Sequence, residues 1–187
     1  MESLFPLEIK FPAGFSYVPE FLNSDEEENL LFEISKIQLH TFTFQGFEAK
    51  RKVASFGYDY SFDKRTISKG NPIPNQFQWL IEKVIDYLKE PKDFAEMLIT
   101  QYPTGSVINW HRDAPPFDII VGISLLGDCR FRFRPHDKAK QGRKSIISFP
   151  VKRRSLYVMK GPARSAWEHS ILPVPAIRYS ITLRTLR

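Results

Sequence analysis

The second half of the chain is a succession of short apolar segments separated by proline, glycine and charged residues. Each segment has strand length and an apolar or alternating pattern, and no helical periodicity interrupts the series. Many consecutive strands without intervening helices indicate a sandwich or a barrel. We expect strands near residues 96–102, 107–112, 117–125, 129–134, 145–150, 155–159, 166–170 and 177–185.

Two helices are expected ahead of this β-rich half. The run Ser24-Asp25-Glu26-Glu27 has the pattern of a capping box and precedes regularly spaced apolar residues, which predicts a helix over about 24–38. Asn75 is a suitable cap for a second helix over about 76–89, which Pro91 ends. The apolar stripe of each helix predicts packing against a sheet.

The length of the chain fits a single domain spanning residues 1–187. About residues 1–90 are expected to supply the helices and a covering lid, and about 91–187 the β-rich core. Within the first part, residues 1–22 are expected to be an extended lead-in and residues 66–74 a loop rich in turn residues.

Charge and cysteine usage narrow the partners and the compartment. The formal net charge of +6 favours a polyanion such as nucleic acid, although a merely soluble basic protein is an equal alternative on charge alone. The basic stretch 136–144 is expected to be a hairpin loop, solvated by default, with phosphate contact as the less favoured alternative. Cys129 is the only cysteine, which predicts a reducing compartment. The N-terminus lacks a signal-peptide pattern and no apolar run is long enough to span a membrane, so we expect a cytoplasmic protein.

The tripeptide His111-Arg112-Asp113 carries the first sign of chemistry. In an extended strand residues i and i+2 project from the same face, so an imidazole and a carboxylate are expected side by side. These are two of the three ligands of the facial triad that holds non-haem Fe(II). His169, on an expected strand, is the natural third ligand, although a lone histidine there is more often a satisfied core residue.

Two arginines follow on the last expected strand. Arg178, Ser180, Thr182 and Arg184 alternate with apolar residues and therefore share one face. Burying two unpaired guanidinium groups is costly, and a dicarboxylate that accepts a bidentate fork from each would relieve that cost. 2-Oxoglutarate is such a ligand and also chelates iron. The alternative is that both arginines face solvent at a barrel rim.

A stretch of alternating aromatic residues lies among cations in the first half. Aromatic faces for base stacking beside cations for phosphates are typical of nucleic-acid binding, whereas the simpler interpretation is a strand that buries its aromatic face in the core. The candidate substrate contacts are Phe56, Tyr58, Tyr60, Lys50, Arg51, Lys52, Lys64 and Arg65.

Taken together, His111-x-Asp113, His169 and the Arg178 to Arg184 spacing resemble the AlkB family of Fe(II)- and 2-oxoglutarate-dependent dioxygenases. The resemblance extends to Gln101-Tyr102-Pro-x-Gly105 and to the strand 154–161, and it covers about residues 90–187. More loosely, Phe56-Gly57-Tyr58 and its surroundings resemble the family's nucleotide-recognition lid. The implied fold is a mainly β (α+β) double-stranded β-helix, or jelly roll, with two supporting helices and this N-terminal lid.

The resemblance also implies a role for each matching residue. His111, Asp113 and His169 would bind iron, with Arg184 engaging the 2-oxoglutarate carboxylate near the metal. Arg178 would clamp the distal carboxylate with help from Tyr102. The family's usual asparagines are replaced by polar residues, Thr100 and Ser180.

The implied reaction consumes O2 and 2-oxoglutarate, with ascorbate as the reductant in vitro, and yields succinate and CO2. On an N-methylated base such as 1-methyladenine or 3-methylcytosine in DNA or RNA it releases formaldehyde. Ala114-Pro115-Pro116-Phe117 stands where the repair members carry acidic residues, so base reading departs from theirs. The alternatives are the same chemistry on tRNA, a protein or a small molecule, and a catalytically silent nucleic-acid-binding module; no obligate protein partner is evident.

Overall fold

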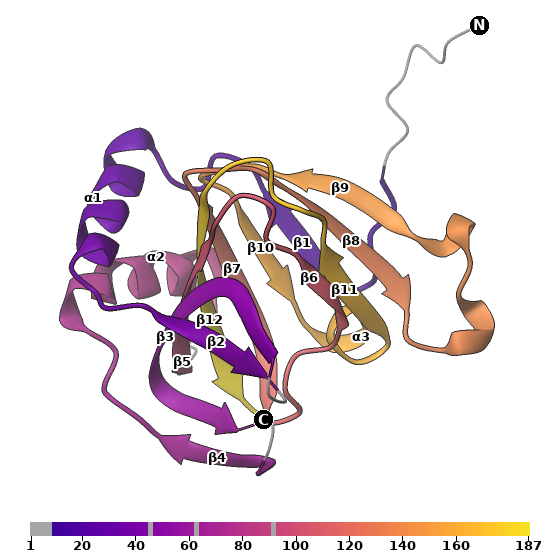
Figure 1. Ribbon diagram of the computed structural model, residues 1–187, viewed down its shortest axis with the longest axis horizontal. Helices are drawn as coiled ribbons and strands as arrows, with labels where there is room; N and C mark the ends of the chain where they lie inside the picture. Colours follow the sequence, from indigo (N-terminus) through magenta and orange to yellow (C-terminus); the bar gives the residue numbers. More distant parts are fainter. Residues whose placement is uncertain (1–8, 45–46, 62–63, 91–92) are drawn as a thin grey trace, which may run out of the picture.

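A computed structural model describes residues 9–44, 47–61, 64–90 and 93–187, and two antiparallel sheets dominate it (Figure 1). The large sheet has the strand order β1-β10-β7-β12-β5-β3-β2, with β4 paired to β3, and the small sheet has the order β6-β11-β8-β9. The strands are β1 (Phe15–Val18), β2 (His40–Phe44), β3 (Phe47–Ser61), β4 (Thr66–Lys69), β5 (Phe94–Tyr102), β6 (Ile108–His111), β7 (Phe117–Leu125), β8 (Cys129–Pro135), β9 (Ile147–Val151), β10 (Leu156–Met159), β11 (Trp167–Ile171) and β12 (Arg178–Leu186).

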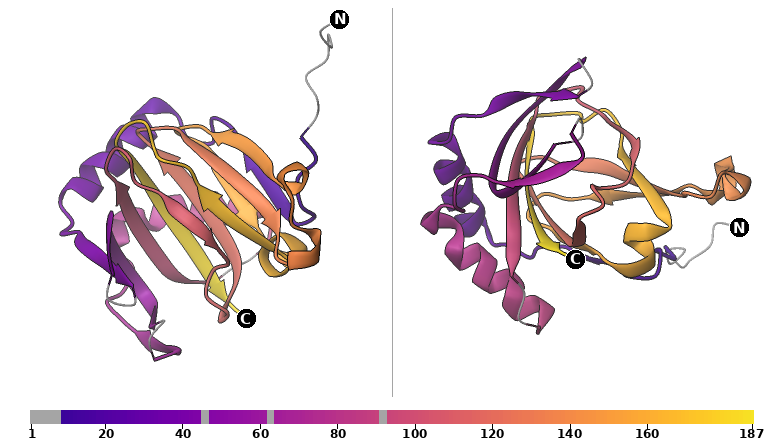
Figure 2. Two further views of the ribbon diagram at one scale, coloured as in Figure 1. Left: turned by 45° about the vertical axis from the view of Figure 1, so that its right-hand side comes forward. Right: turned by 90° about the horizontal axis from the view of Figure 1, so that it is seen from below.

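The helices support the large sheet from outside. They are α1 (Ser24–Ser35), α2 (Gln78–Leu88) and the short α3 (Gly161–Ser165), with 3-10 turns at Asn75–Phe77, Lys138–Lys140 and Arg143–Ser145. The buried faces of α1 and α2 pack against those residues of β5, β7 and β12 that point toward the helices, and together they form one hydrophobic cluster. The two sheets face each other (Figure 2), and a second cluster, rich in phenylalanine, takes its residues from both of them. The predicted jelly roll with two supporting helices is confirmed.

Three local expectations near the helices were wrong. The capping box is one residue earlier than expected, because Asn23, not Ser24, accepts from the Glu26 backbone N–H. Glu27 is instead buried, accepts from the Leu126 backbone N–H and pairs with Arg153, so it is not available for a cap. At the second helix, Asn75 makes no cap; it begins a 3-10 turn, and α2 starts only at Gln78. The expected helix end at Pro91 lies outside the described residues.

The first half is also richer in strands than expected. Residues 66–69 of the expected loop form β4, and β2 was not predicted. β3 pairs with β5 up to Gly57 and with β4 from Tyr58 onward. Among the described residues, no helix combines the length and apolar composition that a membrane crossing requires.

Gly57 is the residue at which β3 changes partner, and we expect Gly57→Ala to destabilise the protein by about 2 kcal/mol or more. Its φ is +85°, and an added Cβ would lie 2.1 Å from the Ala95 carbonyl oxygen, so strain and a backbone clash act together. Urea unfolding measures the effect. Gly142→Ala is the matched control, because nothing lies within 4 Å of a Cβ there; equal stability of the two variants would contradict the prediction.

Candidate metal and co-substrate site

A β-bulge on β6 positions the first candidate ligand. His169 pairs with His111 and Ile171 pairs with Ile108, so two residues of β6 lie opposite the single Ser170. The extra residue brings Ile108 and His111 to the same face, where both line the internal cavity. β6 ends at His111, and Asp113 lies just beyond the strand rather than within it.

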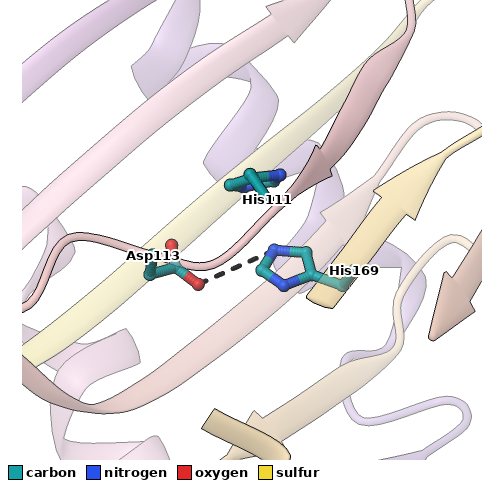
Figure 3. A group of neighbouring side chains, drawn as sticks. All are labelled: His111, Asp113 and His169. Atoms are coloured by element: carbon teal, nitrogen blue, oxygen red, sulfur yellow. Dashed lines mark ion pairs between the residues drawn. The ribbon is translucent and has the colours of Figure 1, made fainter. Parts of the chain in front are cut away.

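The three predicted ligands come together at this point (Figure 3). One ligand atom from each of His111, Asp113 and His169 lies within 4.8 Å of the others, and His169 Nε2 is 3.6 Å from Asp113 Oδ2. His111 Nδ1 is 2.9 Å from the Asn109 carbonyl oxygen; a proton donated there leaves Nε2 as the free lone pair. The His169 ring stacks on the Phe131 ring, with 5.4 Å between the ring centres and an interplanar angle of 7°. Their role as iron ligands stays a prediction.

The electrostatics of the group suit a divalent cation. Burial lowers the pKa of His169 to about 3, so the imidazole is neutral near pH 7 and its lone pair is available. Burial disfavours the charged form of Asp113, yet His169 and Arg184 outweigh it and hold the pKa of Asp113 well below its ordinary value. Asp113 Oδ2 is buried without a hydrogen-bond partner. Two imidazole nitrogens beside one carboxylate with an unsatisfied oxygen are a donor set that fits Fe(II).

Arg184 joins Asp113 to a carboxylate that sequence reasoning missed. Its Nη2 is 3.2 Å from Asp113 Oδ1, and its Nη1 is 2.5 Å from Glu96 Oε2. Glu96 is directly opposite Arg184 in the β5–β12 register and only 3% of its surface is exposed. The pairing register reveals it; the sequence of β5 carries no motif around Glu96.

We expect Glu96→Ala to destabilise the protein by about 3 kcal/mol, because removing one partner of a buried ion pair leaves the Arg184 charge poorly compensated. Urea unfolding measures the loss. Glu28→Ala removes an exposed carboxylate from α1 and should change stability little. Unfolding midpoints that coincide for the two variants would show that the Glu96–Arg184 pair contributes nothing.

Arg178 lies deep in the fold, and no carboxylate of the described residues pairs with it. Only 1% of its surface is exposed, its Nε donates to Ser124 Oγ at 2.9 Å, and its Nη1 has no hydrogen-bond partner. The guanidinium lies 4.8 Å from the centre of the Tyr102 ring. A buried cation with an unused donor fits the distal carboxylate of 2-oxoglutarate.

The polar residues predicted to bind the co-substrate lie close together on β5 and β12. Thr100 pairs with Ser180 across β5 and β12, and the hydroxyls of Tyr102 and Ser180 are 3.4 Å apart. All three are buried. The structure therefore brings the predicted cofactor residues together, while their contacts to 2-oxoglutarate stay a prediction.

A cavity of about 440 Å³ connects the triad with β2 and β3. Arg51, Val53, Ser55, Asp59 and Tyr60 of β3 line it together with Thr41 and Thr43 of β2. Of the candidate substrate contacts, Arg51 and Tyr60 are therefore at the cavity. Its lining does not include Phe56, Tyr58, Lys50, Lys52, Lys64 or Arg65.

Phe56 was assigned to the wrong face. It pairs with Met97 and packs on the cluster beneath the helices, while its neighbours Val53 and Ser55 point into the cavity. A strand was predicted here correctly, but Phe56 faces the core rather than the cavity. The structural interpretation of Phe56 is therefore the correct one.

Arg164 holds the backbone of the loop after Asp113. The buried Arg164 donates to the carbonyl oxygens of Ala114 and Phe117, and Ala114 is buried against the cavity. Besides Asp113, the carboxylates that line the cavity among the described residues are Asp59 and Glu96. Glu96 is paired with Arg184, so among these lining residues an acidic contact to a base would come from Asp59 of β3.

Comparison with known proteins agrees with this site. The family described as the 2OG-Fe(II) oxygenase superfamily matches residues 14–184. The chain is 29% identical over 87% of its length to the mouse tRNA (carboxymethyluridine(34)-5-O)-methyltransferase ALKBH8, of which it spans only 24%. It is also 31% identical over 73% of its length to the human DNA oxidative demethylase ALKBH2, of which it spans 56%.

Solved structures share the fold at low sequence identity. The structure of OsALKBH1 superimposes with a TM-score of 0.75 at 15% identity, covering 96% of this chain and all of that one. A 2OG-Fe(II) oxygenase family oxidoreductase from Burkholderia pseudomallei has a TM-score of 0.66 at 16% identity, covering 92% and 85%. With a family match over most of its length and the predicted triad assembled, the chain belongs to the AlkB family within the 2OG-Fe(II) oxygenase superfamily.

Proposed function

We propose that this protein is a Fe(II)- and 2-oxoglutarate-dependent dioxygenase that oxidatively demethylates N-alkylated bases in DNA or RNA. The observation that carries the proposal is the shared cavity: one continuous space is lined by the triad and by the basic, aromatic ribbon β2–β3. A base taken out of its stack fits a site that is reached past such a ribbon. The human relative named as a DNA oxidative demethylase supports the same reaction.

The cofactors fit the residues present. Iron bound by His111, Asp113 and His169 would supply O2 activation coupled to the conversion of 2-oxoglutarate to succinate and CO2, and the hydroxylated N-methyl group would leave as formaldehyde. The chain contributes positioning and charge. Arg178 offers its free Nη1 to the distal carboxylate, and Arg184 offsets negative charge beside the metal ligands.

At the cavity wall, Arg51 and Tyr60 are placed to contact the nucleotide. Arg51 already stacks over Phe42, with 4.1 Å between its guanidinium carbon and the ring centre, so its charge is held near the opening of the cavity. We place the reaction in a reducing compartment such as the cytoplasm. The only cysteine, Cys129, is buried and free.

A second candidate is oxidation of a modified uridine in tRNA. Two observations favour it: the name of the mouse relative refers to a tRNA uridine, and the loop Ala114–Phe117 lacks the acidic residues of the repair members. This candidate requires no methyl loss. The product would carry one additional oxygen atom.

Mass spectrometry separates the two. Single-stranded DNA and RNA oligonucleotides with 1-methyladenine or 3-methylcytosine, and tRNA carrying carboxymethyluridine derivatives, are incubated with the protein, Fe(II), 2-oxoglutarate and ascorbate, with His111→Ala as the blank. Loss of a methyl group that requires His111 supports demethylation, and gain of one oxygen on tRNA selects the second candidate. Succinate release without either change on any nucleic acid would contradict a nucleic-acid substrate.

A further inference from the structure

The outer face of the small sheet carries an ordered group of cations around one tryptophan. We call it the Trp110 face and define it by Trp110, by the β8 residues Arg130, Arg132 and Arg134, and by the cations Lys138, Lys140, Arg143 and Lys144 of the β8–β9 hairpin. The strand residues lie on the side of the sheet opposite to the triad, because Phe131, Phe133 and His169 point inward. None of these residues has a role in the proposed reaction.

Trp110 reaches across the sheet to β8. Ser170 lies between them: it is opposite the bulge of β6 that contains Trp110, and it pairs with Arg132 on its other side. The guanidinium carbons of Arg132 and Arg134 are each 4.6 Å from the Trp110 ring centre. Beneath them Ser170 is fully covered. The tryptophan therefore holds two guanidinium groups in place on the outer surface.

Arg132 and Arg134 are held in place through Nε, and their Nη donors remain available for a ligand. Arg132 donates through Nε to Ser170 Oγ at 3.0 Å, and Arg134 donates through Nε to Glu168 Oε2 at 2.6 Å. Among the described residues, the Nη atoms of both have no hydrogen-bond partner. Two fixed guanidinium edges with free donors match phosphate oxygens, and their conformational entropy is already restricted before binding.

The charge of the region points to a polyanion. Segment 129–144 contains seven lysines and arginines against one aspartate, whereas the whole chain has a net charge of only +6. The hairpin that carries four of these cations extends away from the barrel, as both views show (Figure 2). A strongly cationic, protruding surface that is separate from the catalytic cavity raises the local concentration of nucleic acid.

The Trp110 face adjoins the cavity across the single strand β6. β6 is the edge strand of the small sheet, and Trp110 precedes His111, which lines the cavity from the other side of the same strand. A nucleic-acid strand with one base in the cavity would pass over β6 as its backbone runs on to the flanking nucleotides. We propose that the Trp110 face binds the sugar–phosphate backbone of nucleotides flanking the modified base, an inference that rests on the nucleic-acid substrate of the proposed function.

Fluorescence anisotropy of labelled single-stranded RNA and DNA, measured across a NaCl series, tests this. For Arg132→Gln/Arg134→Gln we expect roughly tenfold weaker binding, and a slope of log K against log salt that is smaller by about 1.4, at about 0.7 per lost phosphate contact. Lys138→Gln/Lys140→Gln/Lys144→Gln, confined to the exposed hairpin, should act in the same direction. Lys36→Gln/Lys83→Gln, at the C-cap of α1 and on α2, is the charge-matched control for the two-arginine variant and should leave binding unchanged.

Turnover of a mononucleotide separates this surface from the active site. Both sets of variants should oxidise a methylated mononucleotide as the wild type does, because it has no flanking phosphates, while the KM for an oligonucleotide rises about tenfold. Wild-type binding and salt slope in both sets of variants, with oligonucleotide oxidation intact, would overturn the inference and leave the proposed function standing. A wild-type protein that neither binds nor oxidises any nucleic acid would overturn both.

Discussion

Replacing Asp113 with alanine is expected to abolish Fe(II)-dependent succinate formation. The substitution leaves two imidazoles as the donor set, and it removes the carboxylate that partners Arg184 Nη2. The Arg184 guanidinium, then balanced by Glu96 alone, adjoins the cation site, so metal affinity falls for two reasons. Losing an outer partner of a metal ligand typically costs 10- to 100-fold, and we expect loss of the ligand itself to cost on the order of a thousandfold or more.

Two measurements check this result independently. Anaerobic equilibrium dialysis reports Fe(II) affinity without turnover, and mass spectrometry reports succinate. Asp118→Asn is the control, because Asp118 is an exposed carboxylate five residues further along the chain and should retain both. Wild-type Fe(II) affinity in Asp113→Ala would show that the triad is not the metal site.

Arg178→Met is expected to abolish 2-oxoglutarate binding while leaving the unliganded protein as stable as the wild type, or more stable. Arg178 is a buried cation that no carboxylate among the described residues neutralises, so its desolvation opposes folding. Replacing such a charge with an apolar side chain of similar size is often neutral or stabilising. The same change removes the donor proposed for the distal carboxylate, so we expect affinity to fall at least about a hundredfold.

Thermal unfolding with and without 2-oxoglutarate, in the presence of a redox-inert divalent metal, measures both effects. A ligand that binds only the folded state raises the Tm, so the co-substrate should stabilise the wild type and not Arg178→Met. Arg178→Lys keeps the charge but loses the bidentate guanidinium donor, so it should retain part of the Tm increase that 2-oxoglutarate causes. Arg187→Met, at the exposed end of the chain, serves as the control. An undiminished 2-oxoglutarate shift in Arg178→Met would refute the assignment.

The strand pattern was predictable wherever the sequence itself marks both ends of an element. The segment 117–125 coincides with β7 because it is mostly apolar and bounded by Pro116 and by Gly127 shortly after it. At α1 the local signal was ambiguous, since Asn23–Glu26 and Ser24–Glu27 are both possible capping pairs. Glu27 is engaged by Arg153, which is 126 positions away, so only the tertiary structure decides between them.

The candidate site also contains residues that the sequence identifies and residues that it does not. His111, Asp113, His169 and the two arginines have a characteristic spacing and could be identified from residue types. Glu96 could not be, because what distinguishes it is its position opposite Arg184 in a neighbouring strand. For Phe56, the alternating pattern defined two faces but carried no information on which one lines the cavity.

The pairing of His111 with His169 also affects how readily the backbone of β6 unfolds locally. β6 has only four residues and pairs with a single neighbour, β11, so it has fewer backbone hydrogen bonds to hold it than any interior strand. A metal ion bound by both histidines would cross-link β6 to β11. Amide hydrogens of β6 should therefore exchange slowly when the site is loaded and much faster when it is stripped, which couples metal occupancy to local unfolding of the edge on which the Trp110 face lies.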